Sequence, residues 1–433
     1  MGWFNKSIDC IGGVFFRGRA VPRPQEFAFL KQHGMNVGLV KGSTHADWEI
    51  RVRHPQWGNA EIRPEKTRLA PLMIDHDWSL LEGEKEEARA AGVGVRVKIS
   101  ATRANLLADR KNLLRFLRAI MGDDGVMAMD LMAYRLWSRD SLDDEVAHDA
   151  DLDISQIFAI HAVQADNGGP VRWFHTHGLG EIGFFDFDIL HPDESVVSGG
   201  GDLSRSIAFA IAEEAVTLQT ADIKLIHPNG HLAFCPVDKF HKSAPASETR
   251  VRDADEYHME RRAVIVEPTR GFFGRFRRRP RINQFLTRPL PANPVIAFTG
   301  DATNLMASRA RNTYGVFRRI WEDLAELELP MIVKLGYPVD NGADDEREHL
   351  WFQVHAAKEA TIDATLANTP YNVSGMKEGD RSEHSVELIT DWTVMSPIGN
   401  INPRQQHVYR LIREKKDRLK AMMAHMRATR GDA

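Results

Sequence analysis

The chain has 433 residues, of which 43% are apolar and 27% are charged, and its formal net charge is -4. This balance is that of a globular protein, and it argues against a disordered chain and against a protein that coats nucleic acid. The length exceeds one ordinary hydrophobic core, so we expect two or three domains.

The two cysteines, Cys10 and Cys235, lie far apart and are too few for a disulfide framework or a four-thiolate zinc site. Residues 1–16 lack the long apolar stretch and the small-residue cleavage site of a signal peptide. No stretch reaches the roughly eighteen apolar residues that a transmembrane helix needs. We therefore expect a cytoplasmic protein without a membrane anchor.

The first part of the chain predicts a mixture of strands and helices. Residues 48–65 alternate apolar and polar side chains around Gly58, which is typical of a β-hairpin. Residues 84–91 form a charged helical segment, and residues 93–99 alternate as a strand does. Between residues 105 and 121 the apolar positions recur at helical spacing, which predicts an amphipathic helix.

The stretch Trp-Phe-His-Thr-His-Gly-Leu at residues 173–179 has the highest density of chemistry-bearing side chains in the sequence. Side chains alternate along an extended strand, so His175 and His177 share one face with Trp173. Histidine is the commonest protein ligand of zinc and similar metals, and Asp188 follows closely enough to join a site. The predicted metal ligands are therefore His175, His177 and Asp188, and the expected cofactor is a divalent transition metal such as zinc.

A structural role is the alternative for this pair, with both rings half-buried on a sheet face and hydrogen-bonded to backbone or carboxylate groups. Three further histidines bear on the choice. His161 lies in the predicted strand 155–164 and joins the cluster if that strand pairs beside the histidine strand. His227 and His231 flank a Pro-Asn-Gly turn, and that spacing does not bring both rings together, so we expect surface histidines there.

Two segments in the middle of the chain suggest a joint and a basic surface. The glycines at 199–201 predict a joint between two subdomains near residues 195–202, and they lack the Gly-Lys-Ser/Thr of a phosphate loop. Residues 271–288 combine arginines with phenylalanines, which suits phosphate contacts and base stacking. No nucleic-acid-binding signature accompanies this segment, so we do not expect a nucleic-acid partner.

The character of the chain changes near Pro330. Residues 332–336, 350–354 and 385–395 predict strands, and residues 404–427 predict a helix with an apolar stripe and a basic face. The predicted fold class is α+β. The predicted division is a mixed α/β N-terminal region, a small β-rich domain and a basic terminal helix, at residues 1–329, 330–403 and 404–433.

Two resemblances to known families follow from short motifs. Glu-His-Leu-Trp at 348–351, the glycine-containing stretch at 375–380 and Asp-Trp at 391–392 resemble a bacterial domain of unknown function of the YegJ type. The N-terminal part, through residues 160–163 and 173–179, resembles a second uncharacterised bacterial family that carries such a domain behind it. Both resemblances imply a bacterial, cytosolic protein, and neither implies a reaction.

The spacing of the predicted ligands is also similar to that of the JAMM zinc isopeptidases, in which an aspartate ligand lies thirteen positions after the first histidine. That family has a serine and a proline where this chain has Phe185 and Gly178. Asp130 lies upstream at a plausible position for the general base, which is a glutamate in that family. The resemblance implies zinc binding, and the departures from it argue against hydrolysis.

The sequence favours a binding or regulatory protein with a protein partner. The alternative is a metal-dependent hydrolase centred on His175, His177 and Asp188, in which the metal lowers the pKa of a bound water. An open coordination position in a cleft would indicate the hydrolase, whereas rings covered by Trp173 and Phe185 would indicate a structural role. The sequence leaves open whether the protein is an enzyme, its substrate and its oligomeric state.

Overall fold

The computed structural model describes residues 7–18, 20–42, 47–65, 68–77, 79–164, 171–182, 184–190, 262–266, 300–343, 346–404 and 406–430, with shorter pieces between 201 and 241. The basic loop at 271–288 and, apart from Gly201, the joint at 195–202 lie outside these residues. The chain forms two compact units. Unit 1 comprises Met1–Thr67, Gly92–Trp137 and Ile154–Ala297, and unit 2 comprises Arg68–Ala91, Ser138–Asp153 and Phe298–Ala433.

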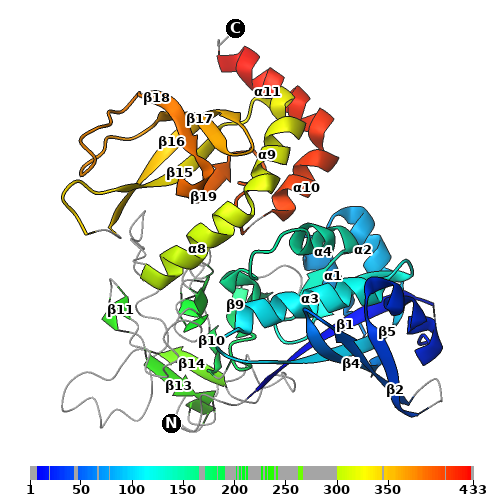
Figure 1. The fold of residues 1–433 in the computed structure, drawn as a ribbon. Helices are drawn as coiled ribbons and strands as arrows, with labels where there is room; N and C mark the ends of the chain where they lie inside the picture. Colours follow the sequence, from blue (N-terminus) through cyan, green and yellow to red (C-terminus); the bar gives the residue numbers. More distant parts are fainter. Residues whose placement is uncertain are drawn as a thin grey trace, which may run out of the picture. The chain divides into compact units, whose positions relative to one another are not determined.

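A seven-stranded sheet forms the first part of unit 1 (Figure 1). Its strands, in spatial order, are β2 (Asn36–Gly42), β3 (Trp48–His54), β4 (Gly58–Glu65), β5 (Ala91–Ala101), β1 (Ile8–Arg17), β6 (Gly125–Asp130) and β7 (Arg135–Trp137). Strands β3 and β4 form the predicted hairpin. The predicted amphipathic helix is α3 (Leu106–Met121), and it packs on β1 and β6 through an apolar stripe that includes the fully buried Leu113, Phe116 and Leu117.

A five-stranded sheet forms the second part of unit 1. Its strands, in spatial order, are β13 (Ala233–Pro236), β14 (Arg262–Val266), β10 (Asp186–Leu190), β9 (Val171–His177) and β8 (Ala159–Gln164). Strands β10 and β14 are parallel, and the other neighbours are antiparallel. Trp173, Leu190 and Val264 belong to its core. A short hairpin, β11 (Ile226–His227) and β12 (Gly230–His231), lies between these elements in the chain.

Unit 2 contains a second five-stranded sheet, all of whose neighbouring strands are antiparallel. Its strands, in spatial order, are β18 (Arg381–Ser385), β17 (Thr361–Leu366), β16 (Arg347–Ala357), β15 (Met331–Pro338) and β19 (Ile389–Val394). Helix α8 (Gly300–Asn312) packs on β19, and α9 (Tyr314–Asp323) follows it (Figure 1). Trp392 joins these layers, because its indole contacts Phe317 and donates a hydrogen bond to Thr313 Oγ1 at 3.1 Å.

Three helices from the N-terminal half of the sequence also belong to unit 2, and they are α1 (Pro71–His76), α2 (Glu82–Arg89) and α4 (Arg139–Val146). Two buried arginines bind these segments. Arg309 donates to Glu145 Oε2 at 3.0 Å, and Arg410 donates to Glu84 Oε1 at 2.7 Å and to Ser138 Oγ at 2.8 Å. The C-terminal sheet thus forms one unit with segments from much earlier in the chain, and the hydrogen bonds that join them span 164 and 326 residues.

The structure confirms the α+β fold class and differs from the predicted elements of the C-terminal part in several details. The terminal helix is two helices, α10 (His407–Glu414) and α11 (Lys416–Arg430), with a break at Lys415. Strands β17 and β18 were not predicted. Strand β17 does alternate between partly buried and buried residues, whereas β18 is an edge strand that is exposed at every position except His384 and has no apolar alternation. The division into consecutive domains at residues 330 and 404 stays a prediction.

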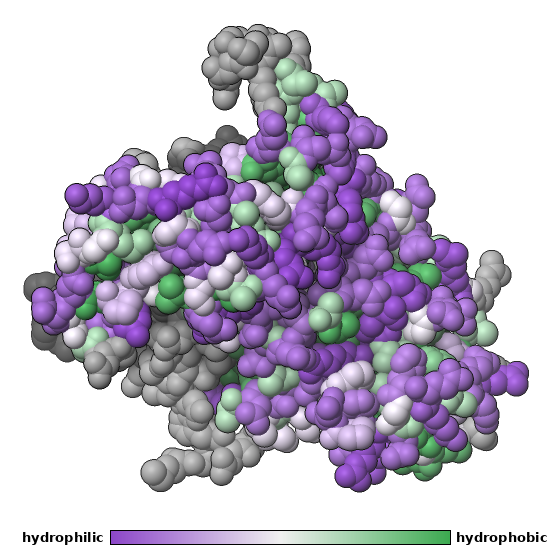
Figure 2. Space-filling view, turned by 45° about the horizontal axis from the view of Figure 1, so that its top comes forward, coloured by the Kyte–Doolittle hydropathy of each residue, from purple (hydrophilic) through white to green (hydrophobic). Residues whose placement is uncertain are grey.

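The face of the molecule drawn in Figure 2 is mostly hydrophilic. In the view of Figure 2, hydrophobic residues lie in small separate groups between hydrophilic ones. None of the helices described is both long and apolar enough to cross a membrane.

Candidate metal site

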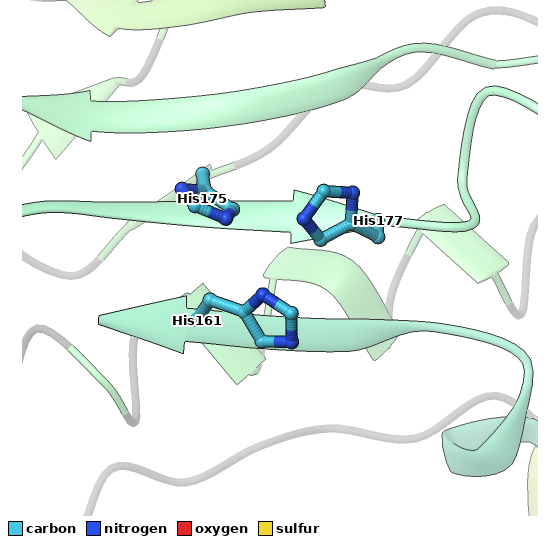
Figure 3. A group of neighbouring side chains, drawn as sticks. All are labelled: His161, His175 and His177. Atoms are coloured by element: carbon cyan, nitrogen blue, oxygen red, sulfur yellow. The ribbon is translucent and has the colours of Figure 1, made fainter. Parts of the chain in front are cut away.

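Three histidines from two neighbouring strands lie together in unit 1. Strands β8 and β9 are antiparallel, and their register places His161 directly opposite His175. His177 lies two residues further along β9 and therefore projects to the same face. One ring nitrogen of each histidine lies within 4.8 Å of those of the other two (Figure 3). His161 was expected to join the cluster if its strand paired with the histidine strand, and β8 does pair with β9.

The three rings form a tight group. The ring centroids are 5.3 Å apart for His161 and His175, 4.8 Å for His161 and His177, and 4.8 Å for His175 and His177. His175 and His177 are buried, with 5% of each exposed, and His161 is partly exposed. A tetrahedral zinc ion with bonds of about 2.0–2.1 Å holds its nitrogen ligands about 3.4 Å apart. The ring nitrogens of the cluster lie within 4.8 Å of one another, so they would need to approach by up to about 1.4 Å to hold a zinc ion.

Asp188, the third predicted ligand, lies on β10 directly opposite His175. Its carboxylate is fully buried and accepts a hydrogen bond from Arg262 Nη2 at 2.8 Å. Arg262 also donates to the backbone carbonyl of Thr176 at 3.0 Å, so it ties β14 to β9 and β10. The group of nitrogen and oxygen donors that converge contains His161 and not Asp188. Metal binding by Asp188 stays a prediction.

The turn after β9 fixes the end of the histidine strand. Gly178 has a φ of +99°, and a Cβ atom there would lie 2.4 Å from the carbonyl oxygen of Ile157. Asp186 accepts hydrogen bonds from the Thr176 hydroxyl at 2.9 Å and from the amide of Leu179 at 3.1 Å. Burial raises the pKa of Asp186, and the nearby guanidinium and these hydrogen bonds offset part of the rise. Asp186 therefore supports the turn.

One aromatic residue from the first sheet reaches the cluster. The ring of Tyr134, in the turn between β6 and β7, lies 4.5 Å from the His177 ring at an interplanar angle of 32°. Tyr134 is 42% exposed, so one side of the cluster is bordered by a side chain that also contacts solvent.

Of the two residues expected to cover the histidines, one contacts them. Trp173 meets His175 edge-to-face at a centroid distance of 5.1 Å, whereas the ring contact of Phe185 is with Phe234 at 4.8 Å. The cluster is thus covered on the Trp173 side and bordered by a partly exposed residue on the Tyr134 side.

The structure gives physical reasons for the departures from the JAMM pattern. Proline cannot occupy position 178, because its φ is fixed near −65° and the chain needs +99° there. Phe185, at the serine position, packs in an aromatic pair. Asp130 forms a buried ion pair with Arg110 and accepts two backbone hydrogen bonds, so its carboxylate already serves the turn after β6.

The other candidate groups do not add to the cluster. His227 and His231 fall in β11 and β12, and their side chains lie outside the described part of the structure. Both cysteines are buried, and burial raises the pKa of Cys10 to about 11, as expected of an unreactive thiol. 

The basic terminal helix, the other basic segment considered for nucleic acid, is partly neutralised within its own unit. Lys416 and Lys420 each form an ion pair with Glu326 at 2.6 Å, and hydrogen bonds from these lysines lower the pKa of Glu326 to about 2.

Sequence reasoning missed two residues of this region. Tyr134 has no motif around it, since its place beside His177 depends on how two sheets meet within unit 1. Arg262 lies 74 residues after Asp188, and no local pattern links the two. His161 carried a partial signal, because it lies in a strand predicted just before the histidine strand, but the pairing of the two strands could not be derived from the sequence.

Comparison with known proteins identifies one segment. Residues 301–400, from α8 to the segment after β19, match a family described as an uncharacterized protein conserved in bacteria (DUF2314). No curated protein and no solved structure matches the chain. The matched segment thus belongs to a bacterial domain of unknown function, and it does not include the histidine cluster.

Proposed function

We propose that the protein binds a divalent transition metal, with zinc as the expected ion, through His161, His175 and His177. The observation that carries this proposal is the convergence of three imidazole nitrogens within 4.8 Å on one sheet face. Neutral imidazole is a preferred ligand of zinc, copper and nickel, and three such ligands leave a fourth position for water or an anion.

We further propose that the metal serves a binding or regulatory role in a bacterial cytosolic protein with a protein partner. The hydrogen bonds and ion pairs that hold the nearby carboxylates of Asp130, Asp186 and Asp188 support this choice over catalysis. We also propose that residues 330–403 form a YegJ-type domain and that the N-terminal part belongs to a second bacterial family, as the sequence motifs suggest.

A metal-dependent hydrolase is the second candidate. A three-histidine site with an open position resembles in composition the sites that activate water, and the partial exposure of Tyr134 offers a route to solvent. Against it, Asp130 is held by Arg110, and Asp188 and Asp186 are both held by hydrogen bonds. A carboxylate paired with an arginine or held by hydrogen bonds is a poor general base, because its lone pairs are directed at those donors.

The test is the metal content of protein purified without chelator or a metal-affinity column, measured by inductively coupled plasma mass spectrometry. We expect about one zinc per chain in the wild type and loss of that zinc in His161→Ala and His177→Ala, because each substitution removes a ligand. His33→Ala is the matched control, because His33 is exposed and lies outside the cluster.

Wild-type protein without metal, or zinc retained in both variants of the cluster, would contradict the proposal. A wild type that binds zinc and also hydrolyses a generic ester or peptide in a zinc-dependent manner would favour the hydrolase. A zinc-loaded protein inactive toward both would favour the binding role.

A further inference from the structure

We infer that Tyr134 is the positioning residue of the histidine cluster, and that its ring holds the His177 ring in the orientation that binds metal. This inference rests on the proposed metal site and deepens it. The backbone of Tyr134 has a conformation that is unusual for this type of residue.

Tyr134 has a φ of +52°, in the left-handed region. Residues with a Cβ atom rarely adopt this region, and glycine, asparagine and aspartate are the usual residues there. A bulky aromatic residue in this conformation is an outlier, and such outliers persist where surrounding structure fixes them, often at functional sites.

The turn that carries Tyr134 is fixed from both sides. Asp130 Oδ1 accepts hydrogen bonds from the amides of Met132 at 2.9 Å and Ala133 at 3.1 Å, and the buried Arg110 holds the same carboxylate. On the other side, Arg135 Nη2 donates to the carbonyl oxygen of Phe158, just before β8. The turn is therefore tied to the strand that supplies His161.

This anchoring brings the face of the Tyr134 ring against the face of the His177 ring, at 4.5 Å and 32°. The lone pair of an imidazole nitrogen lies in the ring plane, so a neighbour on the ring face restricts rotation without blocking the ligand atom. The ring centroids of His161 and His175 each lie 4.8 Å from that of His177, at interplanar angles of 57° and 88°. His177 is thus enclosed by three rings, of which only that of Tyr134 comes from the first sheet.

A purely structural role predicts a different pattern. An aromatic residue that served only to fill the core would be buried, whereas Tyr134 is 42% exposed. An aromatic residue that was merely on the surface would have no reason to adopt a left-handed backbone. Loss of a hydrogen-bonding partner that orients a metal-binding histidine typically weakens metal affinity 10–100-fold, and we expect an effect of that order for a ring that fixes the same orientation by packing.

The experiment compares zinc affinity, measured by competition with a chromophoric chelator, in Tyr134→Gly, Tyr134→Phe and the wild type. Glycine adopts the left-handed backbone freely, so Tyr134→Gly removes the ring without strain. We expect Tyr134→Gly to weaken zinc binding 10–100-fold. Tyr134→Phe keeps the ring and should bind zinc within about twofold of the wild type. Glu328→Gly is the backbone control, because Glu328 has a similar φ of +49° in unit 2, and its zinc affinity should equal that of the wild type.

A second readout is the visible spectrum of the cobalt-substituted protein. We expect Tyr134→Gly to change the cobalt bands, because the His177 ring reorients, and Tyr134→Phe to retain them. Unchanged zinc affinity and cobalt spectrum in Tyr134→Gly would overturn the inference while leaving the metal site intact. A Tyr134→Phe variant as weak as Tyr134→Gly would also overturn it, because the hydroxyl and not the ring would then matter. If the wild type binds neither zinc nor cobalt, the proposed function fails and the inference falls with it.

Discussion

At the scale of single residues, the geometry of the cluster depends on positions that carry no metal ligand. Gly178 ends the histidine strand in a left-handed conformation, and the backbone of Ile157 passes where a side chain would stand. The segment of Ile157 leads directly into β8, so the same close approach sets the distance between the two strands that supply the histidines. The site therefore requires glycine at position 178, where no side chain can be accommodated.

We predict that Gly178→Ala destabilises the protein by about 3 kcal/mol or more, because a Cβ atom 2.4 Å from a backbone oxygen forces the two segments apart. The matched control is Gly58→Ala. Gly58 has a similar φ of +85° but open space around its Cβ position, so the cost there is the left-handed backbone alone, about 1 kcal/mol.

Urea denaturation of both variants measures this difference. We also expect Gly178→Ala to lose zinc and Gly58→Ala to keep it. Equal destabilisation by the two substitutions would show that the approach of Ile157 does not constrain the site.

At the scale of elements, local sequence patterns predicted individual helices and strands well, but they did not predict which strands pair. Alternation predicted the β3–β4 hairpin, and helical spacing predicted α3, because both signals are contained in one stretch of sequence. The shared face of His175 and His177 followed from the same alternation. The pairing of β8 with β9 and of β10 with β14 is non-local, so neither the inclusion of His161 nor the Asp188–Arg262 ion pair could be derived.

The two helices at the C-terminus differ in what they contribute to unit 2. Helix α10 carries Arg410, which is 3% exposed and binds groups from two earlier segments. One turn later Arg413 is exposed and lies over the ring of Tyr409 at 5.1 Å. The two arginines have the same charge and neighbouring places on one helix, and they differ in burial.

We predict that Arg410→Ala destabilises unit 2 by about 3–5 kcal/mol, because it leaves the Glu84 carboxylate without its buried partner. Arg413→Ala should cost no more than about 1 kcal/mol, since an exposed cation over an aromatic ring contributes little. Thermal unfolding followed by circular dichroism compares the two. A small effect of Arg410→Ala would mean that α10 does not hold the N-terminal segments in place.

At the scale of the whole molecule, segments that are neighbours in the sequence do not always belong to the same compact unit. The sequence pattern changes near Pro330, and that change predicts consecutive domains. The compact units are interleaved along the chain, because residues 68–91 and 138–153 group with the C-terminal sheet. The division into domains at residues 330 and 404 stays a prediction. Composition along the chain reports where strands begin, but it carries no information on which distant segments share a core. The family match at 301–400 covers the sheet of unit 2 and not the N-terminal helices packed in the same unit.

Because the units are interleaved, we predict that α4 unfolds together with unit 2 and not with its neighbours in the sequence. Helix α4 follows β7 directly in the chain, yet its Glu145 binds Arg309 of α8. A core substitution in unit 2 should therefore lower the hydrogen-exchange protection of α4, and an equivalent one in unit 1 should not. Phe317→Leu in α9 and Phe116→Leu in α3 are matched, because both phenylalanines are fully buried and each substitution costs about 1–2 kcal/mol.

Native-state hydrogen exchange with mass spectrometry measures the outcome for peptides that cover α4 and β4. We expect Phe317→Leu to reduce protection in α4 and leave β4 unchanged, and Phe116→Leu to do the reverse. If α4 instead loses protection with Phe116→Leu, it unfolds with its neighbours in sequence, and the consecutive division at residue 330 describes the domains. Since the Arg309–Glu145 ion pair is buried at both ends, opening α4 separates two charges in a poorly hydrated interior. That cost is the physical reason to expect α4 to follow the sheet of unit 2.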